Sequence, residues 1–254
     1  MEELFSRNIG LLTETEQERL SKLSVGIAGC GMGSVVASAL VRLGVENFVI
    51  ADGDVVEIHN LNRQAFSWKH IGEKKAGALA EILKGINPQA KISVWEMSLT
   101  PQNVPDFVDA VDLVVDCIDL TQKGLAASII ISQRCQGGKW YLYPLDIGWG
   151  ARLYVFPPTS KIELGDLLGV TQEDLGEAEG VPFELLGQAF SPVLPYMDRV
   201  FEELREGKLR NYPQPVSSTL TAALLVVEAV VKIVRGEIPR SAPDYYAIDP
   251  TTLL

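Results

Sequence analysis

The stretch Val25-Gly26-Ile27-Ala28-Gly29-Cys30-Gly31-Met32-Gly33-Ser34 decides the fold of this chain. Its first four residues form a short apolar run, typical of a buried strand, and a glycine-rich turn follows. Residues 35–43 then carry the pattern of a helix, which Gly44 ends. Strand, glycine turn and helix in this order are typical of nucleotide-binding folds, because glycines let the backbone approach a phosphate at a helix N-terminus. The candidate nucleotide contacts are Gly29, Gly31 and Gly33. A turn made only for tight packing is the alternative interpretation.

The alternation of strands and helices continues outward from this stretch. Further apolar strands are predicted at residues 48–50, 92–97, 113–115, 140–145, 153–156 and near 245–248. Helices are predicted at residues 75–86, 125–135 and about 217–234. Apolar strands that alternate with helices predict a mostly parallel sheet with helices on both faces. We therefore expect a Rossmann-like α/β fold.

One domain over residues 1–254 is expected, in four parts. The order is an N-terminal helical arm (1–23), a nucleotide-binding core (24–156), an irregular crossover insertion (157–215) and a C-terminal helix and strand (216–254). The crossover is rich in Pro, Gly and Glu, and only residues 195–206 carry a weak helical pattern. We expect this part to lie across one face of the domain.

Composition excludes several classes of function. A net charge of −11 over 254 residues argues against non-specific nucleic-acid binding, which needs a basic surface. The acidic start lacks the apolar segment of a signal peptide, and the longest apolar run contains Glu228 and Lys232, so no membrane span is expected. The three cysteines form no paired spacing for zinc or disulfides, which favours the reducing cytoplasm.

Polar residues follow the second predicted strand. Asp52 ends that strand, about twenty residues after the glycine turn, where an acid in such folds accepts hydrogen bonds from a ribose. The loop that follows carries Asp54, Asn60, Arg63 and Gln64, and Lys75 opens the next helix. A dinucleotide has no need of such a cluster, whereas the charge of a triphosphate must be neutralised. An ordinary solvated loop is the alternative.

Asp119 comes just after the fourth predicted strand, in Asp116-Cys117-Ile118-Asp119. Ligands of open α/β sheets lie at this end of the strands, and a carboxylate beside a triphosphate suits Mg²⁺. The alternative is that Asp119 caps the helix starting near Thr121.

At these positions the chain resembles the ThiF/MoeB/HesA family, the bacterial relatives of ubiquitin-activating enzymes. The most specific elements are Ala51-Asp52-Gly53-Asp54 and then Asn60-Leu61-Asn62-Arg63-Gln64. Gly72-Glu73-Lys74-Lys75-Ala76, Asn87-Pro88 and Asp116-Cys117-Ile118-Asp119 follow in the expected order. The resemblance runs over residues 4–156 and resumes in the final helix and strand.

The resemblance implies a homodimer that uses ATP and Mg²⁺ to adenylate a carboxylate, the C-terminus of a ubiquitin-like or sulfur-carrier protein. Asp52 would hold the ribose, and Asp119 would hold the metal. The triphosphate would be held by Asn60, Arg63 and Lys75. Phe5-Ser6-Arg7-Asn8 looks like the family's N-terminal segment, whose arginine enters the partner's ATP site, so Arg7 is a candidate to act in trans beside Arg63 and Lys75. A surface arginine is the alternative.

The chain departs from the family pattern in three ways. The glycine turn is one residue shorter, and Leu120 follows Asp119 where the family usually has asparagine. Zinc-binding cysteine pairs are missing, and no cysteine follows Cys135, so the sequence predicts no thioester on this chain. Other possibilities are a peptide or RNA-linked carboxylate as substrate, a non-catalytic nucleotide-binding protein, and an NAD-dependent oxidoreductase.

Overall fold

The computed structural model describes residues 3–175 and 194–252. Its centre is a seven-stranded sheet with the strand order β3-β2-β1-β4-β5-β6-β7. The strands are β1 (Ser24–Ala28), β2 (Asn47–Ala51), β3 (Lys91–Trp95), β4 (Leu113–Asp116), β5 (Trp140–Ile147), β6 (Gly150–Phe156) and β7 (Tyr245–Ile248). Strands β1 to β5 run parallel to one another, whereas β6 pairs antiparallel with both of its neighbours, β5 and β7. This confirms the expected mostly parallel Rossmann-like sheet.

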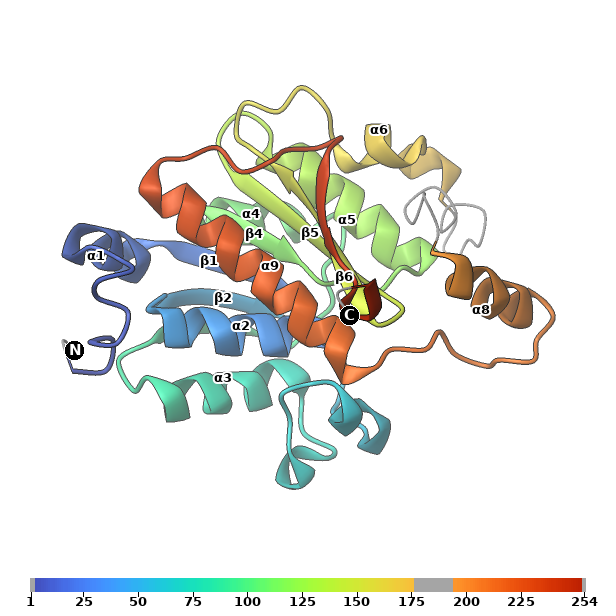
Figure 1. The fold of residues 1–254 in the computed structure, drawn as a ribbon, viewed down its shortest axis with the longest axis horizontal. Coiled ribbons are helices and arrows are strands. Elements are labelled where there is room, and N and C mark those ends of the chain that lie inside the picture. The colour runs from blue at the N-terminus through green and yellow to red at the C-terminus, as the bar shows by residue number, and fades with distance from the viewer. Residues whose placement is uncertain (1–2, 176–193, 253–254) are drawn as a thin grey trace.

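Helices cover both faces of the sheet (Figure 1). One hydrophobic core joins it to α2 (Met32–Leu43), α3 (Lys75–Ile86) and α9 (Val216–Arg235). A second core joins the opposite face to α4 (Val104–Asp109), α5 (Gln122–Cys135), α6 (Leu164–Leu168) and α8 (Pro195–Arg205). The N-terminal α1 (Glu14–Lys22) begins with the capping box of Thr13 and Glu16. Short 3₁₀ turns complete the described elements: η1 (Ile58–Asn62), η2 (Trp68–His70), η3 (Gln172–Asp174) and η4 (Pro250–Thr252).

Three loops leave the sheet side by side at its carboxyl edge. Ala28 of β1 is level with Ala51 of β2 and with Asp116 of β4. The strand order reverses at β1, because its sequence neighbour β2 lies on one side and β4 on the other. Open α/β sheets bind their ligands at such a reversal. The fold therefore brings the predicted nucleotide contacts of three separate segments to one place.

The long helix α9 packs against β5, β6 and α2. It is long and apolar enough to cross a membrane, but half of its most apolar window is buried inside the protein. A helix that is apolar on most sides and packed against a sheet is typical of a domain core.

Several element boundaries differ from the sequence predictions. The helix after the glycine turn begins at Met32 and not at Val35, because the turn itself forms the first helical residues. The third strand ends at Trp95, two residues early, where its carbonyl accepts the N–H of Asp52. The short α4 and α6 were not predicted, since five or six residues carry too little periodicity. Part of the predicted crossover, residues 176–193, lies outside the described residues.

Candidate nucleotide-binding site

Two of the three loop glycines are required by packing. Gly29 has φ +84°, and a Cβ there would lie 2.6 Å from the Cys117 carbonyl oxygen. A Cβ at Gly33 would lie 2.7 Å from Cγ2 of Ile27. Only Gly31 faces a flexible side chain, since its Cβ would meet Gln64 Nε2 at 3.3 Å. Gly29 and Gly33 thus hold the loop against the sheet, and Gly31 is where a ligand can approach the backbone.

The N-terminus of α2 is open to an anion. Its N-cap residue is Gly31, no side chain caps it, and no acidic residue lies in its first turn. An uncapped helix start offers free N–H groups and a positive dipole. Gln64 lies beside it, and the buried Oε1 of that side chain has no hydrogen-bond partner. A hydroxyl or amino group of a ligand could satisfy this oxygen.

Asp52 ties the glycine loop to the loop after β2. Its Oδ2 accepts the N–H of Cys30 at 2.7 Å, and its Oδ1 accepts the N–H of Asp54 at 2.8 Å. A carboxylate has about four acceptor positions, so each oxygen can accept one more hydrogen bond. The side chain is half-buried and held in place, as a ribose ligand would require.

Lys75 is a nearly buried cation at the start of α3. Its Nζ lies 2.9 Å from Oδ2 of Asp54, and the lysine side chain is 10% exposed. Burial opposes its charge, but Asp52, Asp54 and Asp119 outweigh that effect and raise the pKa of Lys75 above its usual value. The lysine therefore stays charged. Its backbone N–H donates to the Asp54 carbonyl, which fixes the helix start beside the loop.

Asp119 lies free at the carboxyl edge of the sheet. The cap of α5 is Thr121, whose Oγ1 accepts the N–H of Gly124 at 3.0 Å, so Asp119 is not the capping side chain. Desolvation of the carboxylate raises the pKa of Asp119. The positive charge of Lys75 opposes this shift, whereas the negative charges of Asp54 and Asp52 reinforce it. The ends of β2 and β4 are level on either side of β1, so Asp119, which follows β4, lies at the same sheet edge as Asp54, which follows β2. An exposed carboxylate in this position has the oxygen donors that Mg²⁺ prefers.

Arg63 approaches the same group from η1 and the residues after it. Its Nη1 donates to Asn62 Oδ1 at 2.9 Å and to the His59 carbonyl at 3.1 Å. Its charge lowers the pKa of Asp119, yet no carboxylate of the described residues lies within ion-pair distance of it. The guanidinium is thus available to a phosphate. Asn60 is buried, and its Oδ1 accepts the N–H of Glu57, so this oxygen shapes the turn.

The structure adds Asp146, which the sequence analysis missed. It lies near the end of β5, and its Oδ2 accepts the Nε2–H of Gln214 at 2.8 Å. Burial raises the pKa of Asp146 to about 6. The hydrogen bond from Gln214 opposes that shift, the negative charge of Asp119 reinforces it, and the positive charge of Arg63 opposes it. Because β5 lies parallel beside β4, with Leu142 level with Val115, Asp146 comes to the same sheet edge as Asp119. Strand position alone could have indicated it, since Asp146 ends an apolar strand as Asp52 does.

A buried carboxyl supports the site from inside the sheet. Asp116 accepts the hydroxyl of Tyr141 at 2.7 Å and the N–H of Ile118 at 3.0 Å. Burial raises its pKa to about 6, although hydrogen bonds from its neighbours oppose the shift. These bonds hold the turn that leads from β4 to Asp119.

Arg7 lies far from the other site residues of its own chain. The neighbouring Asn8 donates to the Leu43 carbonyl at the C-terminal end of α2, whereas Gly31 is at the N-terminal end. A helix of 12 residues is about 18 Å long. The structure therefore brings Asp52, Arg63, Lys75 and Asp119 together, and it does not bring Arg7 to them.

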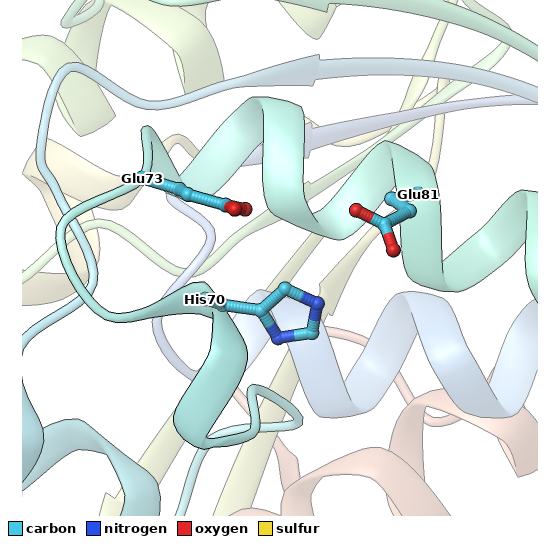
Figure 2. A group of neighbouring side chains, drawn as sticks. All are labelled: His70, Glu73 and Glu81. Carbon is cyan, nitrogen blue, oxygen red and sulfur yellow. The ribbon is translucent and has the colours of Figure 1, made fainter.

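A second polar group lies between η2 and α3, where Glu73 and Glu81 face His70 (Figure 2). Their potential ligand atoms lie within 4.8 Å of one another, and the buried His70 Nε2 has no hydrogen-bond partner. However, His70 Nδ1 accepts the N–H of Ser67 at 3.0 Å, so the proton of the neutral ring is on Nε2. The ring offers the carboxylates an N–H and not the lone pair that a metal needs. We interpret this group as structural.

The family model described as "ThiF family" matches residues 5–253. The chain belongs to the ThiF family. Among curated relatives of this ThiF-family chain, Adenylyltransferase and sulfurtransferase MOCS3 of Xenopus laevis is 26% identical over 216 residues, which are 77% of the chain and 47% of the relative. Ubiquitin-like modifier-activating enzyme 5 of Bombyx mori is 32% identical over 146 residues, which are 53% of the chain and 36% of the relative. The chain thus spans about half the length of the curated relatives it matches, or less.

Solved structures show the same fold. The chain aligns with PaaA at a TM-score of 0.70 and 16% identity, covering 98% of the chain and 70% of PaaA. The E. coli tRNA N6-threonylcarbamoyladenosine dehydratase TcdA aligns at a TM-score of 0.64 and 19% identity, covering 92% of the chain and 95% of TcdA. E. coli MccB with ATP aligns at a TM-score of 0.67 and 17% identity, covering 93% of the chain and 63% of MccB. At these identities the likeness establishes the fold, and the site must be argued from its residues.

Proposed function

We propose that this ThiF-family chain uses ATP to adenylate a carboxylate, the C-terminus of a ubiquitin-like or sulfur-carrier protein. The observation that carries the proposal is the meeting of Lys75, Arg63 and Asp119 at one sheet edge, beside the uncapped start of α2. The relatives' names support the reaction class, since one is an adenylyltransferase and another a ubiquitin-like modifier-activating enzyme. TcdA and MccB have both been solved with ATP.

In the proposed reaction, an acceptor carboxylate oxygen bonds to the α-phosphorus of ATP. The bond from that phosphorus to the bridging oxygen of the pyrophosphate breaks, and the electron pair leaves with pyrophosphate. Asp52 would orient the ribose, and the free N–H groups of α2 would hold phosphate oxygens. Lys75 and Arg63 would neutralise the charge that develops on the leaving group.

Asp119 fits the role of a Mg²⁺ ligand by the chemistry of its donor group. When bound, the ion would supply positive charge to a site that already holds several carboxylates. The four acids Asp52, Asp54, Asp119 and Asp146 outnumber the cations Lys75 and Arg63. We therefore expect ATP to bind weakly when EDTA removes divalent ions, as calorimetry with and without Mg²⁺ would show.

The chain's own thiols do not suit a thioester. Cys30, Cys117 and Cys135 are all buried. Desolvation by burial raises the pKa of each thiol, to about 12 for Cys135, and this suppresses the reactive thiolate. We infer that the reaction on this chain stops at the acyl-adenylate, which a thiol of another molecule would accept.

We also propose a cytoplasmic homodimer in which Arg7 acts on the partner's site. This is supported by its separation from its own site along α2. If Arg7→Ala and Lys75→Ala chains are each inactive, an equal mixture should regain about a quarter of the wild-type activity, since half of the dimers then hold one intact site. No regain after subunit exchange would exclude action in trans.

Pyrophosphate exchange tests the proposed function. Labelled pyrophosphate should enter ATP only when a protein ending in a free Gly-Gly carboxylate is present, and not when that carboxylate is amidated. ATP binding without exchange for any carboxylate partner would indicate a non-catalytic nucleotide-binding protein. Binding of NADH in place of Mg²⁺–ATP would favour an oxidoreductase, and a thioester on one of the chain's own cysteines would contradict the inferred end point.

A further inference from the structure

The guanidinium of Arg63 is held on one side by its own loop. Its Nη1 carries two hydrogens and has two acceptors, Asn62 Oδ1 at 2.9 Å and the His59 carbonyl at 3.1 Å. Its Nε and Nη2 make no hydrogen bond to the described residues, and together they form a fork that can bind two oxygens of one phosphate. The direction of this fork therefore depends on how firmly Asn62 is held.

Asn62 is held by the segment that returns from the crossover to the sheet, residues 212–219. The Nδ2 of Asn62 donates to the Gln214 carbonyl at 3.3 Å. Further along the same segment, Thr219 Oγ1 donates to the Arg63 carbonyl at 3.0 Å. The return segment thus supports both the backbone of Arg63 and the neighbour that fixes its side chain.

Gln214 is itself fixed, through its backbone and through its side chain. It stands between Pro213 and Pro215, and a residue that precedes proline is restricted to extended conformations. Its Nε2 donates to Asp146 Oδ2 at 2.8 Å, at the end of β5. The hydroxyl of Tyr212 donates to the backbone carbonyl of the same aspartate at 3.4 Å. The end of β5 is therefore the anchor of the return segment.

We propose that Gln214 is a positioning residue that aligns the guanidinium of Arg63, and that Asp146 anchors it. Hydrogen bonds of 2.8, 3.3 and 2.9 Å lead from Asp146 through Gln214 and Asn62 to the guanidinium. They join the end of β5 to the loop after β2, although β1 and β4 lie between these strands in the sheet. The effect on ATP rests on the proposed function, whereas the alignment of the side chain does not.

Alignment before the ligand arrives favours binding. A free arginine side chain loses rotamer freedom when it is fixed on a ligand, and a side chain that is already held loses less. The charge of Asp146 acts in the opposite sense, because a carboxylate near a triphosphate repels it. Its hydrogen bond to Gln214 is therefore the contribution of Asp146 that strengthens ATP binding.

Nitrogen-15 relaxation of the Arg63 Nε–H group in the ligand-free protein tests the alignment. Gln214→Ala should lower the order parameter of this group, because Asn62 then loses its anchored partner. Gln133→Ala is the matched control: its Nε2 also donates to a carboxylate, Glu163 Oε1 at 3.0 Å, but near the C-terminal end of α5. The control should leave Arg63 unchanged. An order parameter that is equal in Gln214→Ala and the wild type would overturn the proposal.

Two substitutions that remove the same charge test the anchor. Asp146→Asn keeps an oxygen that can accept the Gln214 N–H, whereas Asp146→Ala does not. In calorimetry with Mg²⁺, the alanine variant should bind ATP about 5- to 10-fold more weakly than the asparagine variant. Circular dichroism checks that both are folded. Equal affinities of the two folded variants would exclude Asp146 as the anchor.

A double-mutant cycle tests whether Gln214 acts through Arg63. Gln214→Ala alone should weaken ATP binding by about 5- to 10-fold, and by less than about twofold when Arg63→Met is already present. In the Lys75→Met background the loss should stay at about 5- to 10-fold, because Lys75 takes no part in these hydrogen bonds. A loss that persists without the guanidinium would refute a role through Arg63. Absence of ATP binding by the wild type would refute the proposed function, and the relaxation measurement would still decide the alignment.

Discussion

Lys75→Met would remove one positive charge from the candidate site and keep an unbranched side chain in the same buried position. Lys75 Nζ lies 2.9 Å from Asp54, and the lysine side chain is 10% exposed. A hydrogen bond to a charged group contributes about 1.5–3 kcal/mol. Losing such a bond to a phosphate should therefore weaken ATP binding by about 10- to 150-fold.

The same substitution should change stability little. Asp54 is 67% exposed on its side chain, so its charge stays solvated when the lysine is gone. Methionine in a buried position needs no partner, and an ion pair to a carboxylate as exposed as Asp54 stabilises the fold by only about 0–1 kcal/mol. We expect the free energy of unfolding to change by less than about 1 kcal/mol. A large loss of binding with little loss of stability would assign Lys75 to the ligand.

Calorimetry with ATP and Mg²⁺ measures the binding change, and urea unfolding measures stability. Lys84→Met is the matched control, because Lys84 is an exposed lysine near the other end of α3. It should bind ATP as the wild type does. The reasoning is refuted if Lys75→Met binds ATP with the wild-type dissociation constant, or if Lys84→Met loses as much affinity.

Three further changes test how the loops around the site are held. Gly29→Ala should cost about 2 kcal/mol or more in urea unfolding, because its Cβ would meet the Cys117 carbonyl at 2.6 Å. Gly137→Ala, with φ +78° but open space, should cost only about 1 kcal/mol, and equal losses would deny a packing role for Gly29. Thr121→Ala should lower stability by about 1 kcal/mol, since it removes the cap of α5; an unchanged melting temperature would contradict this. Burial raises the pKa of Asp116 from 3.8 to about 6, so the folded state binds this proton more strongly than the unfolded chain does. Stability from this group is present below pH 4 and is lost as pH rises to 6, by about 3 kcal/mol. Asp116→Asn should lack that loss in urea unfolding at pH 4, 5 and 6, and a slope equal to the wild type's would refute the assignment.

The sequence by itself determined the elements whose signals are local. The apolar run before Gly29 and the helix pattern after the turn are periodicities over fewer than twenty residues. The helix predicted over residues 75–86 has the same two boundaries as α3, which begins at Lys75 and ends before Asn87-Pro88. Asp52 and Asp119 were predicted to lie at one edge because each follows a strand, and the parallel strands β2 and β4 do end at one edge.

Only the tertiary structure decided which side chains meet across long separations. Asp146 and Gln214 are 68 positions apart, and Thr219 reaches the Arg63 carbonyl over 156 positions. No local pattern encodes such pairs, because they depend on where the crossover returns to the sheet. The same holds for Arg7, whose distance from its own site is set by how the arm packs against the end of α2. Local periodicity predicts elements, and the packing of those elements decides which charges lie together at the carboxyl edge of the sheet.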